Sequence, residues 1–366
     1  MEIGILIIVF WYVLNILWLV YGFAKVKSFV TKTTSPLHRF SIIVPFRNEA
    51  ENLPQLLNSL SNLNYPKDLF EVILVNDASE DQFQIPNLPL QILVLDTIRT
   101  TPSPKKDAIN TAIQKANHNW IITTDADCEV GEDWLKSFDS FIQNYEPKMI
   151  ASGVYFKASN SILDSFQQLD LLSLQGTTIG SFGNQQAFMC NGANFCYHKS
   201  FFEALNGFDG NDTIASGDDV FLLQKAIAKD AKDVHFLKSE ATQIQTQPET
   251  SWRGLFYQRV RWASKTANYS GNYSKQLGLS VFMMNLFWIL SLILVCLGLI
   301  EYPYFLLMVV AKLSVDALLL VKTNCFFKTQ IRHFALSNLI YPFFSTTVVI
   351  YSFFGNYSWK GRTFKK

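Results

Sequence analysis

Long apolar segments occupy both ends of this 366-residue chain, and they constrain its fold more than any other feature. The stretch 3–24 is apolar apart from Asn15, and at about 1.5 Å per residue it is long enough to cross a hydrocarbon core of roughly 30 Å. Because it lacks a basic start and a small-residue cleavage site, we interpret it as a membrane helix and not a cleaved signal peptide. Only 17% of the residues are charged, which agrees with partial burial in lipid because soluble domains carry about 25%.

A second apolar block begins near Leu277. Lys312 and Asp316 interrupt its middle part, and Pro342 breaks its last part. Residues 317–366 contain seven Lys/Arg and no acid, which favours a cytoplasmic tail and a re-entrant or interfacial element around the proline. We expect an N-terminal transmembrane helix (1–24), a basic linker (25–39), a cytosolic domain (40–276), transmembrane or re-entrant helices (277–355) and a basic tail (356–366).

The middle of the chain has the alternating pattern of a soluble α/β domain. Short apolar runs at 40–46, 70–76, 91–95 and 120–124 predict strands buried on both faces, as in a parallel sheet. The run 91–95 is equally consistent with an edge strand. We predict a Rossmann-like, mostly parallel sheet flanked by helices that begin at a capping box (Asn48-x-x-Glu51) and cover 105–116 and 132–144.

Several function classes are excluded by composition and motif. Lys+Arg (31) and Asp+Glu (30) nearly cancel, so no overall field would attract nucleic acid. The five cysteines include no CxxC pair, which argues against a zinc site and a disulfide framework. The first strand–helix turn (45–49) has no glycine, so the dinucleotide fingerprint G-x-G-x-x-G is absent, as is the P-loop of NTPases.

Three acids follow two of the expected strands. Asp77 ends the run EVILVND, and Asp125 and Asp127 end the run WIITTDAD. Because ligands of open α/β sheets bind beyond the carboxyl ends of the strands, these acids are expected to meet a ligand. Two carboxylates so close together favour a compensating cation, and oxygen ligands suit Mg²⁺ or Mn²⁺ held jointly with substrate phosphates. The alternative is that they are solvated loop acids.

Two further clusters have both a functional and a structural interpretation. Asp218 and Asp219 precede a helical run, where they either complement the helix dipole or supply a carboxylate base. In the segment QRVRW, helical spacing puts Gln258, Arg261 and Trp262 on one face. An arginine fork there suits phosphate oxygens, whereas the structural alternative is an aromatic–basic helix lying on lipid headgroups.

Taken in order along the chain, these clusters resemble family 2 glycosyltransferases of the GT-A fold, especially the membrane-bound inverting ones. The resemblance covers roughly residues 40–265, about three fifths of the chain. It rests on the ordered set SIIVPFRNEAENL (41–53), VNDAS (75–79), TDAD (124–127), GAN (192–194), GFD (207–209), GDD (217–219) and QRVRW (258–262).

The resemblance implies a role for each matched residue. Asp219 would be the catalytic base, and Asp218 stands beside it where the family commonly has Glu. Asp127 would coordinate a divalent ion, and Asp125 would contact the ribose or the metal region. The donor would also be contacted by Pro45 and Glu49 in the first loop, Asp77 at the base, Lys106 in the Lys-rich segment 105–108, and the QxxRW residues Gln258, Arg261 and Trp262, which close over the diphosphate and the acceptor end.

The implied function is transfer of a sugar from a UDP- or GDP-sugar to a lipid or lipid-linked glycan, dependent on Mg²⁺ or Mn²⁺. The enzyme would be integral to the inner or cell membrane, with its catalytic domain in the cytoplasm. A processive polysaccharide synthase is the alternative within the family. A nucleotidyltransferase or a non-catalytic membrane adaptor is the alternative from another class.

Overall fold

The computed structural model describes residues 2–32, 35–157, 160–269, 271–355, 357–359 and 362–364. The chain forms two compact units, and each is assembled from separate stretches of sequence. The sheet unit consists of Lys27–Lys157 and Met189–Gln247, and the helical unit of Met1–Val26, Ala158–Phe188 and Pro248–Lys366. The stretches 158–188 and 248–276, which the sequence analysis joined to the cytosolic domain, therefore belong to the helical unit.

The sheet unit is built on a mixed, mostly parallel sheet with the strand order β3-β2-β1-β4-β8-β6-β9. The neighbours β3, β2, β1 and β4 run parallel, whereas β8 is antiparallel to both β4 and β6. This confirms the predicted fold class. The strands are β1 (Phe40–Phe46), β2 (Phe70–Asn76), β3 (Ile92–Asp96), β4 (Trp120–Thr123), β6 (Met149–Ser152), β8 (Phe195–His198) and β9 (Val234–Leu237), and a smaller sheet holds β5 (Cys128–Glu129), β10 (Ile244–Thr246) and β7 (Val154–Phe156).

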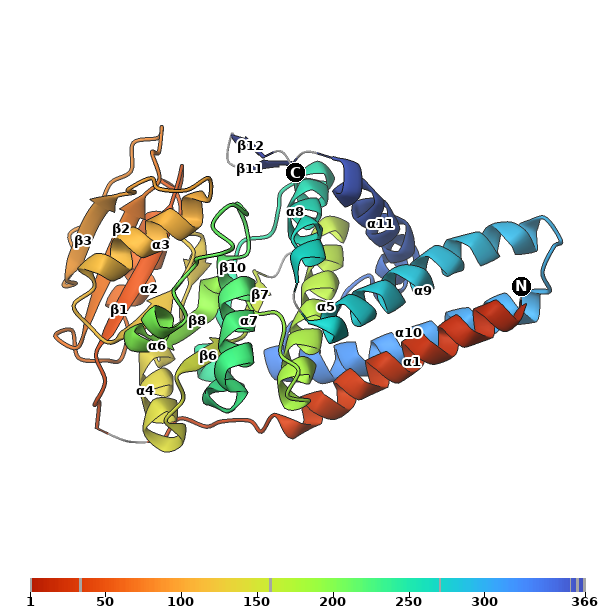
Figure 1. Cartoon of the computed structure of the whole chain (residues 1–366), viewed down its shortest axis with the longest axis horizontal. Coiled ribbons are helices and arrows are strands. Elements are labelled where there is room, and N and C mark those ends of the chain that lie inside the picture. Colours follow the sequence, from red (N-terminus) through yellow and green to blue (C-terminus); the bar gives the residue numbers. More distant parts are fainter. Residues whose placement is uncertain are drawn as a thin grey trace. The chain divides into compact units, whose positions relative to one another are not determined.

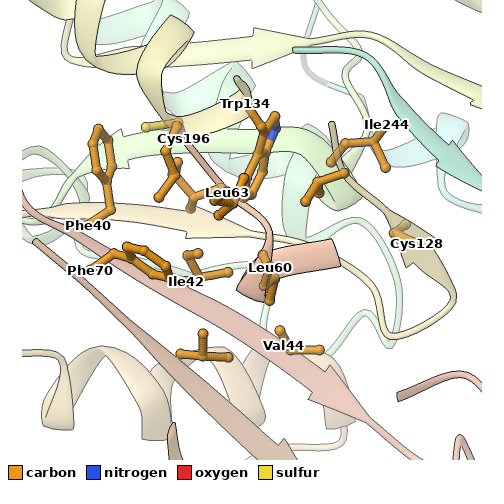
Figure 2. Close-up of a cluster of buried hydrophobic side chains, with 14 of the residues drawn as sticks. Phe40, Ile42, Val44, Leu60, Leu63, Phe70, Cys128, Trp134, Cys196 and Ile244 are labelled. Carbon is orange, nitrogen blue, oxygen red and sulfur yellow. The ribbon is translucent and has the colours of Figure 1, made fainter. Parts of the chain in front are cut away.

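Helices cover both faces of this sheet (Figure 1). Phe40, Ile42 and Val44 project from alternate positions of β1 into one apolar core with α2 and α4, around the fully buried Trp134 (Figure 2). On the other face, α3 packs against β1 and β2. The helices of this unit are α2 (Leu53–Ser61), α3 (Pro104–Lys115), α4 (Trp134–Tyr145), α6 (Lys199–Ala204) and α7 (Asp218–Asp230), with 3₁₀ turns η1 (Gly192–Asn194), η2 (Ala231–Asp233) and η3 (Glu240–Thr242).

The predicted capping box at Asn48 is wrong. The helix α2 begins at Leu53, after Asn52, and no side chain caps its amino end. Asn48 instead has a left-handed backbone (φ 54°), and Glu49 accepts a hydrogen bond from the side chain of Asn52, 2.5 Å away. The first loop is thus longer than the sequence indicated, which places Asn48 and Glu49 at the edge of the sheet and not in a helix.

The helical unit contains four helices long and apolar enough to cross a membrane, among the residues that the structure describes: α1, α9, α10 and α11. Within this unit, α1, α9 and α10 lie side by side, and α11 is inclined to them (Figure 1). The unit's elements are α1 (Glu2–Lys25), α5 (Ile162–Gly183), α8 (Trp252–Ser264), η4 (Thr266–Asn268), α9 (Asn272–Cys296), α10 (Tyr302–Phe327), α11 (Phe334–Phe354), β11 (Tyr357–Trp359) and β12 (Arg362–Phe364). Of the predicted tail, residues 356, 360, 361, 365 and 366 lie outside the described residues.

Glycines bring α1 and α5 into backbone contact. A Cβ atom at Gly22 would overlap the carbonyl oxygen of Gly180, and one at Gly183 would overlap that of Gly22. Small residues at such a crossing let two helices pack closely, as is common between helices in membranes. The interrupting charges of α10 are also accommodated inside this unit. Lys312 Nζ lies 2.5 Å from Asp316, which accepts a 2.5 Å hydrogen bond from Tyr12 of α1.

Candidate active site

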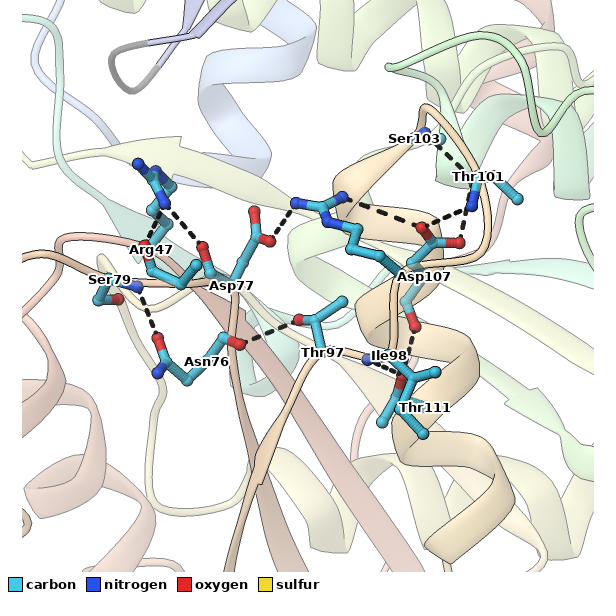
Figure 3. Close-up of polar contacts among 12 residues, drawn as sticks. Arg47, Asn76, Asp77, Ser79, Thr97, Ile98, Thr101, Ser103, Asp107 and Thr111 are labelled. Carbon is cyan, nitrogen blue, oxygen red and sulfur yellow. Dashed lines mark hydrogen bonds and ion pairs between the residues drawn. The ribbon is translucent and has the colours of Figure 1, made fainter.

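Arg47 joins the loops that follow β1 and β2. Its Nη1 donates to the carbonyl oxygens of Asp77, at 2.9 Å, and of Ala78 (Figure 3). Its Nη2 lies 2.6 Å from a carboxylate oxygen of Glu80. Because the strands β1 and β2 are parallel neighbours, these loops emerge at the same edge of the sheet. The buried guanidinium makes them one platform at the carboxyl edge, where ligands of such sheets bind.

Two residues of this platform have backbone conformations that non-glycine residues seldom adopt. Asn48 has φ 54° and Ala78 has φ 53°. Hydrogen bonds between the loops hold them: Asn48 N donates to Ser79 Oγ at 3.1 Å, and Glu80 N donates to Asn48 Oδ1 at 2.8 Å. Strained backbone of this kind persists where the surroundings over-determine it, which is frequent at binding sites.

The carboxylate of Asp77 is paired with Arg99, which sequence reasoning missed (Figure 3). Arg99 Nη1 also lies 3.9 Å from Asp107, a buried residue in the first turn of α3. Asp107 in turn accepts hydrogen bonds from the backbone of Thr100 and Thr101, at 3.1 and 3.0 Å. The loop before α3 is therefore tied to the acid that follows β2. Pro45, at the end of β1, and the buried Glu49 belong to the same edge.

Lys105 links the acid after β4 to the acid that starts α7. Its ammonium lies 2.6 Å from Asp125 Oδ1 and 3.6 Å from Asp218 Oδ2. Burial alone would lower the pKa of Lys105, but the negative charges of Asp125, Asp218 and Asp219 outweigh burial and raise this pKa above its ordinary value. The structure therefore brings together acids that lie 93 positions apart in the sequence, from Asp125 to Asp218.

Asp219 is held by the short 3₁₀ turn η1. Its Oδ2 accepts a 2.9 Å hydrogen bond from Gly192 N, and its Oδ1 accepts one of 2.7 Å from Val220 N. A Cβ atom on Gly192 would lie only 3.0 Å from Asp218 Oδ2, so a larger residue here would push that carboxylate aside by a few tenths of an ångström. Thr123, at the end of β4, donates to Gly192 O at 2.6 Å and completes the link to the central sheet.

Asp127 and Lys106 are two further residues for which the sequence predicted a role in the site. Cys128 Sγ lies 3.7 Å from Asp127 Oδ1, and burial, followed by the charges of Asp127 and Asp125, raises the pKa of that thiol. Lys106 is buried, and its ammonium donates to the carbonyl oxygens of Asn211, at 2.5 Å, and Ile214, at 2.9 Å. It thus fixes the loop that leads to Asp218. Its predicted contact with a nucleotide stays a prediction.

The acidic side chains of the site suit a metal ion that is bound jointly by the protein and by substrate phosphates. Over the described part of the chain, no three His, Cys, Asp or Glu side chains form a group that would hold a metal ion by themselves. Mg²⁺ typically binds through one or two carboxylates and substrate phosphates. Asp125 and Asp127, both on the turn after β4, fit that second mode.

The QxxRW residues lie on α8, in the helical unit. Gln258 donates to Glu249 Oε1 at 3.1 Å and accepts from Arg259. Arg259 lies within the motif, at a position for which the sequence predicted no role, and it is buried. Its Nε lies 2.5 Å from Asp170 of α5. Its guanidinium lies 4.2 Å from the ring centre of Trp262. A buried ion pair therefore anchors the helix. The implied roles of Gln258, Arg261 and Trp262 in donor binding stay predictions.

Comparison with known proteins gives the class. The sequence profile of Glycosyl transferase family 2 matches residues 41–205. The mannosyltransferase PcManGT from Pyrobaculum calidifontis has a similar fold, with 18% identity, a TM-score of 0.58 and coverage of 96% of this chain and 98% of that one. Residues 41–205 therefore match glycosyl transferase family 2, and the sheet is of the GT-A type, as the sequence motifs predicted.

Two curated relatives are similar over part of their length. The glycosyltransferase AglE of Haloferax volcanii is 30% identical over 134 residues, which are 35% of this chain and 43% of AglE. The poly-beta-1,6-N-acetyl-D-glucosamine synthase of Staphylococcus epidermidis is 26% identical over 269 residues, 68% of this chain and 62% of the synthase. The chain thus spans less than two thirds of either relative.

Proposed function

We propose that this chain is a membrane-bound inverting glycosyltransferase that moves a sugar from a UDP- or GDP-sugar to a lipid or lipid-linked glycan. The observation that carries the proposal is the convergence of Asp125, Asp218 and Asp219 at the carboxyl edge of a family 2 sheet. PcManGT, which shares the fold, was solved in complex with GDP-Man and Mn²⁺, in support of a nucleotide-sugar donor and a divalent cation. Four long apolar helices support an acceptor within the membrane.

Asp219 would act as the general base. It would accept the proton of the acceptor hydroxyl while that oxygen attacks the anomeric carbon, and the bond to the nucleoside diphosphate would break in the same step. An ionised carboxylate has about four lone-pair positions. The hydrogen bonds from Gly192 and Val220 orient the carboxylate of Asp219.

The negative charge that accumulates on the leaving diphosphate needs compensation. A divalent cation, held by Asp125 and Asp127 together with the diphosphate, would supply it. The platform fixed by Arg47 would seat the nucleotide between the loops after β1 and β2. Because a single displacement needs no covalent intermediate, the anomeric configuration would be inverted.

The test is transfer of a radiolabelled sugar from UDP- and GDP-sugars to extracted membrane lipids by the full chain in nanodiscs. Asp219→Asn should retain donor binding and lose about 10²–10⁴-fold in transfer rate, the usual worth of a general base. Asp230→Asn, at the other end of α7, should transfer at the unaltered rate. An Asp219→Asn variant as active as the parent chain would refute the base assignment.

A processive synthase is the second candidate, because similarity to the poly-beta-1,6-N-acetyl-D-glucosamine synthase extends over 68% of this chain. The size of the labelled product separates the two: one sugar per lipid supports the proposal, and a polymer that lengthens with time supports the synthase. Release of free pyrophosphate would indicate a nucleotidyltransferase. A protein that binds neither UDP nor GDP in the presence of Mn²⁺ would be an adaptor.

A further inference from the structure

We infer that Lys105 is an internal counter-ion that competes with the divalent cation for the acids of the active site. In the absence of donor, its ammonium neutralises Asp125 and Asp218. When the donor binds with its cation, the ammonium moves to the diphosphate. The cation would therefore bind weakly alone and tightly with a nucleoside diphosphate. The inference rests on the proposed function in so far as that function includes the cation.

The ammonium of Lys105 occupies a position between two acids of the active site. It lies between two acids from different elements, at 2.6 Å from Asp125 and 3.6 Å from Asp218. The side chain of Lys105 is only 20% exposed and that of Asp218 only 11%, so the attraction is screened less than on an open surface. Asp125, at 37% exposed, is the member most accessible to an incoming ion.

The negative charges near Lys105 outnumber its single positive charge. Asp125 and Asp127 share one turn, and Asp218 and Asp219 start one helix. The ammonium of Lys105 lies 2.6 Å from one member of the first pair and 3.6 Å from one member of the second. Like charges at this spacing need a cation. Lys105 already supplies one positive charge to Asp125, so a divalent ion must share or displace it. A bound diphosphate changes the balance, because its own negative charges attract both the ion and the ammonium.

The neighbouring lysine, Lys106, has different contacts from Lys105. Lys106 donates to backbone carbonyl oxygens of Asn211 and Ile214. It therefore positions the loop before Asp218. Lys115, on the last turn of the same helix, is exposed and offers a matched control.

The experiment measures Mn²⁺ binding to the full chain in nanodiscs, by calorimetry and by electron paramagnetic resonance, without nucleotide and with saturating UDP or GDP. Lys105→Met should bind Mn²⁺ about tenfold more tightly than the parent chain without nucleotide, because one nearby positive charge is removed. With nucleotide the order should reverse, since the ammonium no longer reaches the diphosphate. Lys105→Arg should behave like the parent chain, and so should Lys115→Met.

The outcomes separate this inference from the proposed function. If Mn²⁺ binds with a nucleotide, but Lys105→Met matches the parent chain without one, the counter-ion role is refuted and the glycosyltransferase proposal stands. If no variant binds Mn²⁺ under any condition, the cation of the proposed function fails, and this inference with it. Should Lys105→Met unfold, Lys105→Gln takes its place, with the midpoint of thermal unfolding as the check on folding.

Discussion

Neighbouring side chains with the same chemistry have different tasks in this protein. Lys105 lies against the acids of the candidate site, whereas Lys106 donates to backbone carbonyl oxygens. The sequence indicated a lysine-rich segment near the donor, but successive residues of a helix point about 100° apart. Which lysine contacts the acids depends on the residue at which α3 begins, and the sequence does not determine that residue.

The positions of the candidate acids at the ends of strands were predictable from sequence, and their basic partners were not. Asp77 and Asp125 follow apolar runs that ended where the strands end. Arg47, Arg99 and Arg259 act through tertiary contacts with groups at least 22 positions away or in another helix. No periodicity marks such a partner, so only the folded chain reveals it.

At the residue scale, we predict that Arg259→Lys destabilises the helical unit. Lysine cannot pair with Asp170, donate to Gln258 and stack on Trp262 at once, because these contacts use the planar guanidinium. The free energy of unfolding in detergent should fall by about 1.5–3 kcal/mol, the worth of a hydrogen bond to a charged group.

The exposed Arg253 on the same helix provides the control for this substitution. Arg253→Lys should change the free energy of unfolding by less than about 0.5 kcal/mol, as surface substitutions usually do. Equal denaturant midpoints for the two variants would contradict the anchoring role of Arg259.

Elements buried on both faces were the most predictable. The runs that became β1, β2 and β4 are apolar throughout because helices cover both sides of the sheet. The strand β3 is largely exposed and lies at the edge of the sheet, which settles the alternative left open by its sequence. The start of α2 was misjudged, because loop contacts of Asn48 outweigh its local preference for capping.

At the element scale, we predict that Gly180→Val separates α1 from α5. A side chain at this position would collide with backbone atoms of Leu19, which cannot move aside as a flexible side chain can. Overpacking of this kind typically costs about 1–3 kcal/mol, so the midpoint of thermal unfolding in detergent should fall. Gly278→Val on α9 is the matched control, because nothing lies within 4 Å of its Cβ position. Similar midpoints for the two variants would argue against the glycine contact.

On the scale of the whole molecule, α1, α9 and α10 are proposed to cross the membrane, with Lys25 and Lys328 on the cytoplasmic side, in accord with the positive-inside rule. The inclined α11, which continues as one helix through Pro342, would then lie along the membrane interface with both ends on that side.

A cysteine-labelling experiment tests this topology. Cys296, exposed at the end of α9, should react with a membrane-impermeant maleimide added to intact cells. Single-cysteine variants Lys328→Cys and Phe354→Cys should react only after the cells are opened, because both positions are expected in the cytoplasm. Labelling of Phe354→Cys from outside would show that α11 crosses as a fourth span.

The interleaving of the two units limits how this protein can be divided. The polypeptide passes from one unit to the other after residues 26, 157, 188 and 247. A fragment cut at the boundaries suggested by hydropathy, 40 and 276, would retain α5 and α8 but lose α1, α10 and α11, on which those helices pack. Such a fragment would expose apolar surfaces and aggregate in water. A soluble version would instead have to omit the terminal stretches 1–26 and 248–366 and the internal stretch 158–188, with residues 157 and 189 joined.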